Sequence, residues 1–128
     1  MVTHIQFEEY INEAVAMVPK LVRERIENVA FVAEDEPTAL SAKNRQAQSS
    51  GLLLGLYEGV PLPKRSGYYS GVLPDKITIF KNAIEQVAGP DQEAIRLKTH
   101  EVVHHEIGHY LGMDERTVRA WEYKRKKQ

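Results

Sequence analysis

Apolar positions recur with helical spacing at the start of the chain and with strand spacing soon afterwards. Hydrophobic residues three and four apart predict an amphipathic helix over residues 7–18, and Pro19 is suited to open a second helical stretch that reaches Ile26. The apolar run at residues 29–32, which acidic residues and Pro37 follow, predicts a first strand. The chain is therefore expected to begin with helices and then to become extended.

Two more strands are predicted farther along, on either side of a long loop. The leucine-rich residues 52–57 favour a second strand, and alternation of isoleucine with polar residues predicts a third over residues 76–80. Residues 59–74 hold three glycines and three prolines and predict a loop. The polar residues 39–50 predict an exposed excursion between strands.

Residues 92–111 contain no proline and predict a long helix. At about 100° per residue, the apolar side chains form two arcs, so we expect a central helix that is packed from both sides. His105 and His109 continue the arc of Ile95 and Val102, and we expect their rings to face inward.

Two other histidines of this helix, His100 and His104, fall on the second arc beside Ile107 and Leu111. A single histidine on an apolar helix face is more often a core residue with a hydrogen-bond partner than a ligand. We therefore expect both to be partly buried and assign neither to a metal.

His105, Glu106 and His109 form the string HEIGH, an HExxH pattern inside the predicted helix. Residues four apart lie on the same helix face, so the two imidazoles can converge on one ion while Glu106 points to the adjoining space. Catalytic zinc sites use this arrangement. Protein ligands hold the metal, and a carboxylate acts as general base toward a water in the open position. The pattern predicts a site for one zinc ion.

A third ligand is expected just after the helix. Gly112 is suited to a left-handed helix end, which would turn the chain back toward the metal. Residues 105–115 read HExxHxxGxxE, so Glu115 is the first choice and Asp114 the alternative. Either acid would also suit the start of a last helix, as cap or first-turn residue. Glu122 is a further and weaker candidate.

Five stretches of the chain together resemble the small, mostly bacterial zincin-like metallopeptidase family. The most specific is the HExxHxxGxx(D/E) core, and the pieces GLYxGxPL and LPDxITI distinguish this family from zincins in general. The stretches are FEEYINEA, IENVAFVAEDEP, LLLGLYEGVPLP, GVLPDKITIF and VVHHEIGHYLGMDE.

This resemblance implies a fold, an activity and a set of site residues. The fold would be α+β: a two-layer, zincin-like single domain over residues 1–128, with a small mixed sheet of about three strands on a central active-site helix and with N- and C-terminal helices. His105, His109 and Glu115 would be zinc ligands, and Glu106 would be the general base. The chain departs from better-known extended-motif peptidases because no methionine-bearing turn follows Glu115; the nearest methionine is Met113.

The predicted loop carries candidate substrate-binding residues. Zinc peptidases commonly hold an extended peptide against a sheet edge. Arg65 and Tyr69, with Tyr68 between them in the same loop, are candidates to line such a cleft, where one of them would polarise the scissile carbonyl or steady the developing oxyanion. An ordinary surface loop explains them equally well.

Composition and charge narrow the function classes. The chain has 128 residues, no cysteine and a net charge of −1. These values fit one domain and exclude disulfides, thiolate ligands and a cysteine nucleophile. Near-neutral charge argues against a nucleic-acid partner, and the absence of a long apolar run argues against a membrane partner and favours the cytoplasm. The oligomeric state is not fixed by these features.

The sequence therefore predicts a zinc-dependent metallopeptidase that acts on a peptide or protein. The alternative, which the missing methionine turn supports, is a zinc-stabilised interaction domain without turnover, or a metal-free domain that binds peptides at a strand edge. A solvent-open site would favour the enzyme, and a closed one the interaction domain.

Overall fold

The computed structural model describes residues 1–26, 28–37, 53–59 and 75–112. They form an α+β arrangement of helices and a three-stranded mixed sheet, as the sequence predicted. In chain order the elements are α1 (His4–Met17), α2 (Lys20–Arg23), β1 (Val29–Glu34), β2 (Gly55–Glu58), β3 (Asp75–Phe80), α4 (Lys81–Ala88) and α5 (Gln92–Tyr110).

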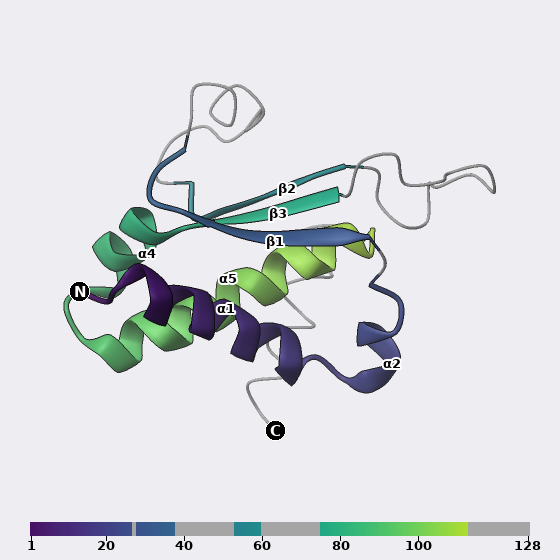
Figure 1. The fold of residues 1–128 in the computed structure, drawn as a ribbon, viewed down its shortest axis with the longest axis horizontal. Helices are drawn as coiled ribbons and strands as arrows, with labels where there is room; N and C mark the ends of the chain where they lie inside the picture. The colour runs from purple at the N-terminus through teal and green to yellow at the C-terminus, as the bar shows by residue number, and fades with distance from the viewer. Residues whose placement is uncertain (27, 38–52, 60–74, 113–128) are drawn as a thin grey trace.

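The sheet has the order β1-β3-β2, with β1 parallel and β2 antiparallel to the central strand β3. Ile77 of β3 lies level with Phe31 of β1 and with Tyr57 of β2, so these side chains share one face. Figure 1 shows α1 and α5 along one face of the sheet and α4 beyond the end of the strands, where it packs on α5, which makes a two-layer structure. Ile77 and Ile79 are fully buried between the layers.

α5 is the central element of the helical layer. It packs on α1 and α4 as well as on β2 and β3, so both predicted apolar arcs are used. Five of its side chains are completely buried: Ile95, Thr99, Val103, Ile107 and Tyr110. Asp91 caps its first turn by accepting a hydrogen bond from the Ala94 amide at 2.9 Å.

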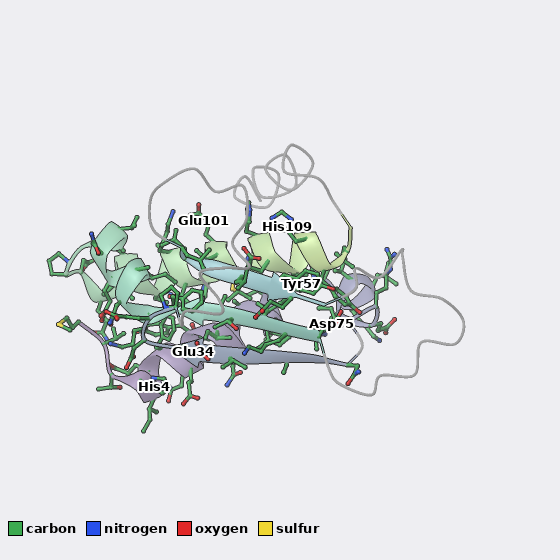
Figure 2. The ribbon with its side chains drawn as sticks, turned by 90° about the horizontal axis from the view of Figure 1, so that it is seen from above. His4, Glu34, Tyr57, Asp75, Glu101 and His109 are labelled. Atoms are coloured by element: carbon green, nitrogen blue, oxygen red, sulfur yellow. The ribbon has the colours of Figure 1, made fainter. Side chains whose placement is uncertain are left out.

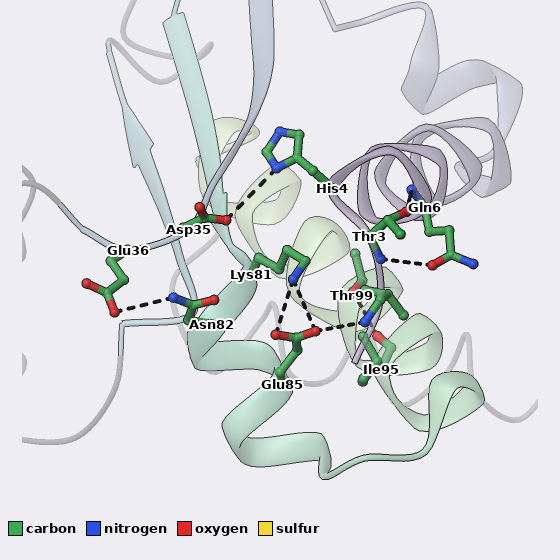
Figure 3. Close-up of polar contacts among 11 residues, drawn as sticks. Thr3, His4, Gln6, Asp35, Glu36, Lys81, Asn82, Glu85, Ile95 and Thr99 are labelled. Atoms are coloured by element: carbon green, nitrogen blue, oxygen red, sulfur yellow. Dashed lines mark hydrogen bonds and ion pairs between the residues drawn. The ribbon is translucent and has the colours of Figure 1, made fainter.

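α1 begins three residues before the predicted start because polar residues form a capping box there. The Thr3 hydroxyl accepts from the Gln6 amide at 3.1 Å, and the Gln6 side chain accepts from the Thr3 amide at 2.9 Å. Figure 3 shows this reciprocal pair. The second helical stretch is shorter than predicted and spans only Lys20–Arg23.

α4 is an element that the sequence reading left out. It follows β3 without a loop, buries Ala83 and Ile84, and ends at Gly89, whose φ is 84°. Its Lys81 ammonium donates to Glu85, the two groups lying 3.2 Å apart and almost buried. Glu85 also accepts from the Val2 amide at 2.9 Å, so α4 anchors the start of the chain (Figure 3).

Strand bounds shift slightly from the prediction. β1 and β3 are confirmed, with β1 extended to Glu34, whereas β2 begins at Gly55 rather than at residue 52. The predicted C-terminal helix, the polar stretch 39–50 and nearly all of the loop 59–74 lie outside the described residues. None of the described helices is long and apolar enough to cross a membrane.

Candidate metal centre

His105, Glu106 and His109 come together near the C-terminal end of α5. One donor atom from each lies within 4.8 Å of the other two. The two imidazole centroids are 4.8 Å apart and their planes are inclined at 72°. This proximity follows from the i, i+4 spacing that the sequence indicated.

The donor set fits a zinc ion. Neutral imidazole nitrogens and carboxylate oxygens are preferred zinc donors, and two nitrogens that share one tetrahedral zinc lie roughly 3.3 Å apart. The spread of at most 4.8 Å among the donor atoms of His105, Glu106 and His109 is close to this spacing, which suits two imidazole ligands with a carboxylate beside the ion.

The rings of His105 and His109 are partly exposed to solvent. His105 and His109 are only half-buried, whereas Glu106 between them is 8% exposed. On the helical wheel both histidines lie beyond Val102, at the margin of the buried arc, so their rings are partly exposed. Seen from above in Figure 2, His109 projects beyond the β2 edge of the sheet.

α5 ends as predicted, directly after the site. Gly112 is left-handed, with a φ of 83°, and its amide donates to the His109 carbonyl at 2.9 Å. Asp114 and Glu115, the predicted alternatives for the third ligand, lie outside the described residues, as do Glu122, Arg65 and Tyr69. Their roles stay predictions.

His100 and His104 are buried and hydrogen-bonded, as predicted. His100 Nε2 donates to the Glu13 carboxylate at 2.9 Å, and His104 Nε2 donates to the Ala14 carbonyl at 2.7 Å. These contacts face α1, on the side of α5 away from His105 and His109. The hydrogen bond from His100, together with Arg96, lowers the pKa of Glu13 below its ordinary value against an opposing effect of burial.

A group of polar contacts that the sequence reading missed holds β2 over the end of α5. The Tyr57 hydroxyl donates to the buried Asp75 carboxylate at 2.7 Å, and the Tyr57 ring meets Tyr110 edge-on at 5.9 Å. Tyr110 in turn donates to the Arg25 carbonyl at 3.1 Å. Figure 2 shows Tyr57 and Asp75 beside each other on the sheet. The signal in the sequence was a tyrosine in a short apolar strand, because a packed tyrosine usually finds a hydrogen-bond partner for its hydroxyl.

Comparison with known proteins gives one family and one fold. Residues 26–125 match the family described as zincin-like metallopeptidase. The solved structure of a conserved hypothetical protein from Thermus thermophilus is similar, with a TM-score of 0.56 and 21% identity, over 86% of this chain and 94% of that chain. No protein of curated function matches.

Proposed function

The chain belongs to the zincin-like metallopeptidase family, and on that premise we propose that it is a zinc-dependent peptidase with its active centre on α5. One observation carries the proposal. The donor atoms of His105, Glu106 and His109 gather within 4.8 Å, at a half-buried position beside the sheet.

In this proposal, His105 and His109 hold the zinc through their imidazole nitrogens. Glu115 is the third ligand, with Asp114 as the alternative. Both residues follow the left-handed turn at Gly112, which would direct the chain back toward the metal. When bound, zinc would lower the pKa of a coordinated water and polarise the substrate carbonyl.

Glu106 is the general base. Its carboxylate takes the proton from the attacking water and returns it to the leaving amine as the peptide bond breaks. Its small exposed fraction, 8%, supports this role because a packed side chain has few rotamers and stays aimed at the reaction site.

The substrate class follows from the sheet beside the helix. β2 is an edge strand of the described sheet, bonded to β3 on one side, and it packs directly on α5. Such a strand can receive an extended peptide through main-chain hydrogen bonds, which hold the scissile bond in register. We assign Arg65 and Tyr69 to the cleft that would hold this peptide, where one of them would steady the oxyanion.

The half-buried histidines also favour the enzyme over the closed interaction domain. A structural zinc site surrounds its ion with four protein ligands, whereas a catalytic site keeps one position open to solvent. The exposure of His105 and His109 supports an open position.

The decisive experiment combines metal analysis with digestion of a peptide library. The native protein should contain about one zinc per chain and cleave unfolded peptides. Glu106→Gln should keep zinc and lose turnover by a factor on the order of 10² to 10⁴, because the proton acceptor is gone.

Glu101→Gln is the matched control. Glu101 lies on the same helix, is half-buried and pairs with Lys98 at 3.4 Å. It should retain full activity. A Glu106→Gln protein that cleaves at the native rate would show that Glu106 is not the base, and a zinc-loaded native protein that cleaves nothing would favour the interaction domain.

A further inference from the structure

The point where β2 crosses α5 has no side chain on the strand. A Cβ atom placed on Gly55 would lie 2.8 Å from Val102 Cγ1 and 3.1 Å from Glu106 Cγ. Both distances are shorter than an ordinary carbon–carbon contact of about 3.5–4.0 Å. A side chain at residue 55 would therefore overlap Val102 and press on the stem of Glu106 by a few tenths of an ångström.

Backbone conformation does not explain the glycine. Among the described glycines, Gly59, Gly89 and Gly112 have positive φ angles, and Gly55 does not. Glycine within a strand also weakens it, because it adds backbone entropy and packs no side chain. The remaining physical reason is space between the strand and the helix.

The position of Gly55 in the sheet makes this space matter. Gly55 is level with the fully buried Ile79, on the face that meets the helices. Two residues later, Tyr57 contacts Tyr110 from the same face. β2 therefore contacts α5 one turn before Glu106, at Val102, and one turn after it, at Tyr110.

Val102 and Glu106 would respond differently to a methyl group added at Gly55. Val102 is branched at Cβ, and a helix leaves it one strongly preferred rotamer, so it cannot turn away easily. Glu106 is unbranched at Cβ, so its Cγ can give by the few tenths of an ångström that the 3.1 Å contact requires. Its carboxylate would move with the stem and lose its native position relative to the nitrogens of the histidines.

We propose that Gly55 is a positioning residue for the general base: its missing side chain lets β2 confine the Glu106 stem and hold the carboxylate beside His105 and His109. This inference rests on the proposed function for the role of Glu106. It adds a residue on another element, outside the HExxH string.

The test compares Gly55→Ala, Val102→Ala and the double variant. Val102→Ala is the matched control because it loosens the same contact without touching Glu106. The double variant removes the 2.8 Å overlap and keeps the 3.1 Å one, so it also serves if Gly55→Ala folds poorly. For each protein, kcat, KM, zinc affinity and the thermal midpoint are measured on a peptide that the native enzyme cleaves.

We expect Gly55→Ala to lower kcat about threefold to tenfold, because the 3.1 Å contact requires the Glu106 stem to shift by a few tenths of an ångström, and a misplacement of roughly 1 Å costs on the order of a hundredfold. KM and zinc affinity should change by no more than about threefold, because the imidazoles are not displaced. Val102→Ala should lose stability and keep kcat. The double variant should have a higher thermal midpoint than Gly55→Ala and still a low kcat. If kcat recovers together with the midpoint, Gly55 serves packing alone and the proposal is wrong.

A structural readout separates this proposal from the proposed function. Crystal structures of the native and Gly55→Ala proteins should show the Glu106 carboxylate displaced from the two imidazoles, whose own separation is unchanged. A carboxylate that keeps its place overturns the positioning role. If the native protein cleaves no peptide, the proposed function fails, while this comparison still decides what Gly55 does.

Discussion

Two adjacent histidines of α5 have opposite environments. His104 is 3% exposed and donates Nε2–H to the Ala14 carbonyl, which fixes its tautomer because a carbonyl can only accept. Ala14 lies in the last turn of α1, where carbonyls lack an intrahelical partner, and the Val18 amide bonds to Val15 instead. His104 therefore caps α1, whereas its neighbour His105 belongs to the candidate metal centre.

Alanine substitutions at His104 and His109 should have opposite effects. His104→Ala should lower the free energy of unfolding of the metal-free protein by about 1–3 kcal/mol, since it leaves a buried carbonyl unsatisfied. Its zinc affinity should stay within about threefold of native, because the donor atoms are untouched. His109→Ala should abolish zinc binding and change the stability of the metal-free protein little. Denaturant unfolding and competition with a zinc chelator measure both quantities.

Each histidine variant is the control for the other. Loss of zinc by His104→Ala at unchanged stability would mean that this ring, and not only its neighbour, is a ligand.

The third ligand is tested in the same way at two further residues. Glu115→Ala should weaken zinc binding by at least about a hundredfold, because a site with two imidazoles holds the ion poorly. Asp114→Ala should cost only helix-cap stability, about 1 kcal/mol. The zinc affinities of the two variants decide between the acids, and the reverse order would assign Asp114.

At the scale of elements, a charged cluster joins α1 to α5. Glu13 of α1 accepts from Arg96 Nε and from His100 Nε2, each at 2.9 Å. Arg96 also pairs with Glu93 at 2.9 Å. Because the Glu13 side chain is 43% exposed, solvent screens these pairs and limits their contribution to stability.

The lowered pKa of Glu13 predicts how this contact responds to acid. The unfolded chain takes up the Glu13 proton at a higher pH than the folded protein, so the stabilisation is complete above the unfolded pKa, which is about 4.3. It is lost as pH falls through the folded value. Glu13→Gln keeps an acceptor for His100 and removes the charge.

Stability curves of the two proteins should therefore differ in slope. The native protein should lose more stability than Glu13→Gln on acidification below about pH 5, by less than about 1 kcal/mol because the pair is exposed. Urea unfolding at several pH values measures the difference. Parallel curves would show that Glu13 does not stabilise the contact between the helices.

At the scale of the whole molecule, one metal ion would be held by residues that only the folded chain brings together at the end of α5. A ligand that binds only the folded state raises the free energy of unfolding by about 4 kcal/mol when its free concentration is a thousand times its Kd. Chelation of zinc should lower the thermal midpoint of the native protein accordingly.

The His109→Ala protein is the reference for this experiment. Its midpoint should not respond to chelator, since it holds no ion to remove. An equal shift in both proteins would place the metal at another site.

The sequence by itself determined those features that depend on neighbours a few residues apart. Helical spacing located α1 and α5, alternation located β3, and the i, i+4 pair placed His105 and His109 on one helix face. Gly112 marked the end of α5, as its positive φ confirms. These signals are local because side-chain direction repeats every 3.6 residues in a helix and every two in a strand.

The tertiary structure alone decided which surfaces meet. The His104–Ala14 bond spans 90 residues of sequence, and no spacing rule predicts it. α4 was missed because it follows β3 without a break, and the exposure of His105 and His109 depends on where the helical layer ends. The close approach of Gly55 to Glu106 likewise comes from the packing of a strand on a helix. Such contacts depend on the shapes of two distant segments at once, which a pattern read along one segment does not contain.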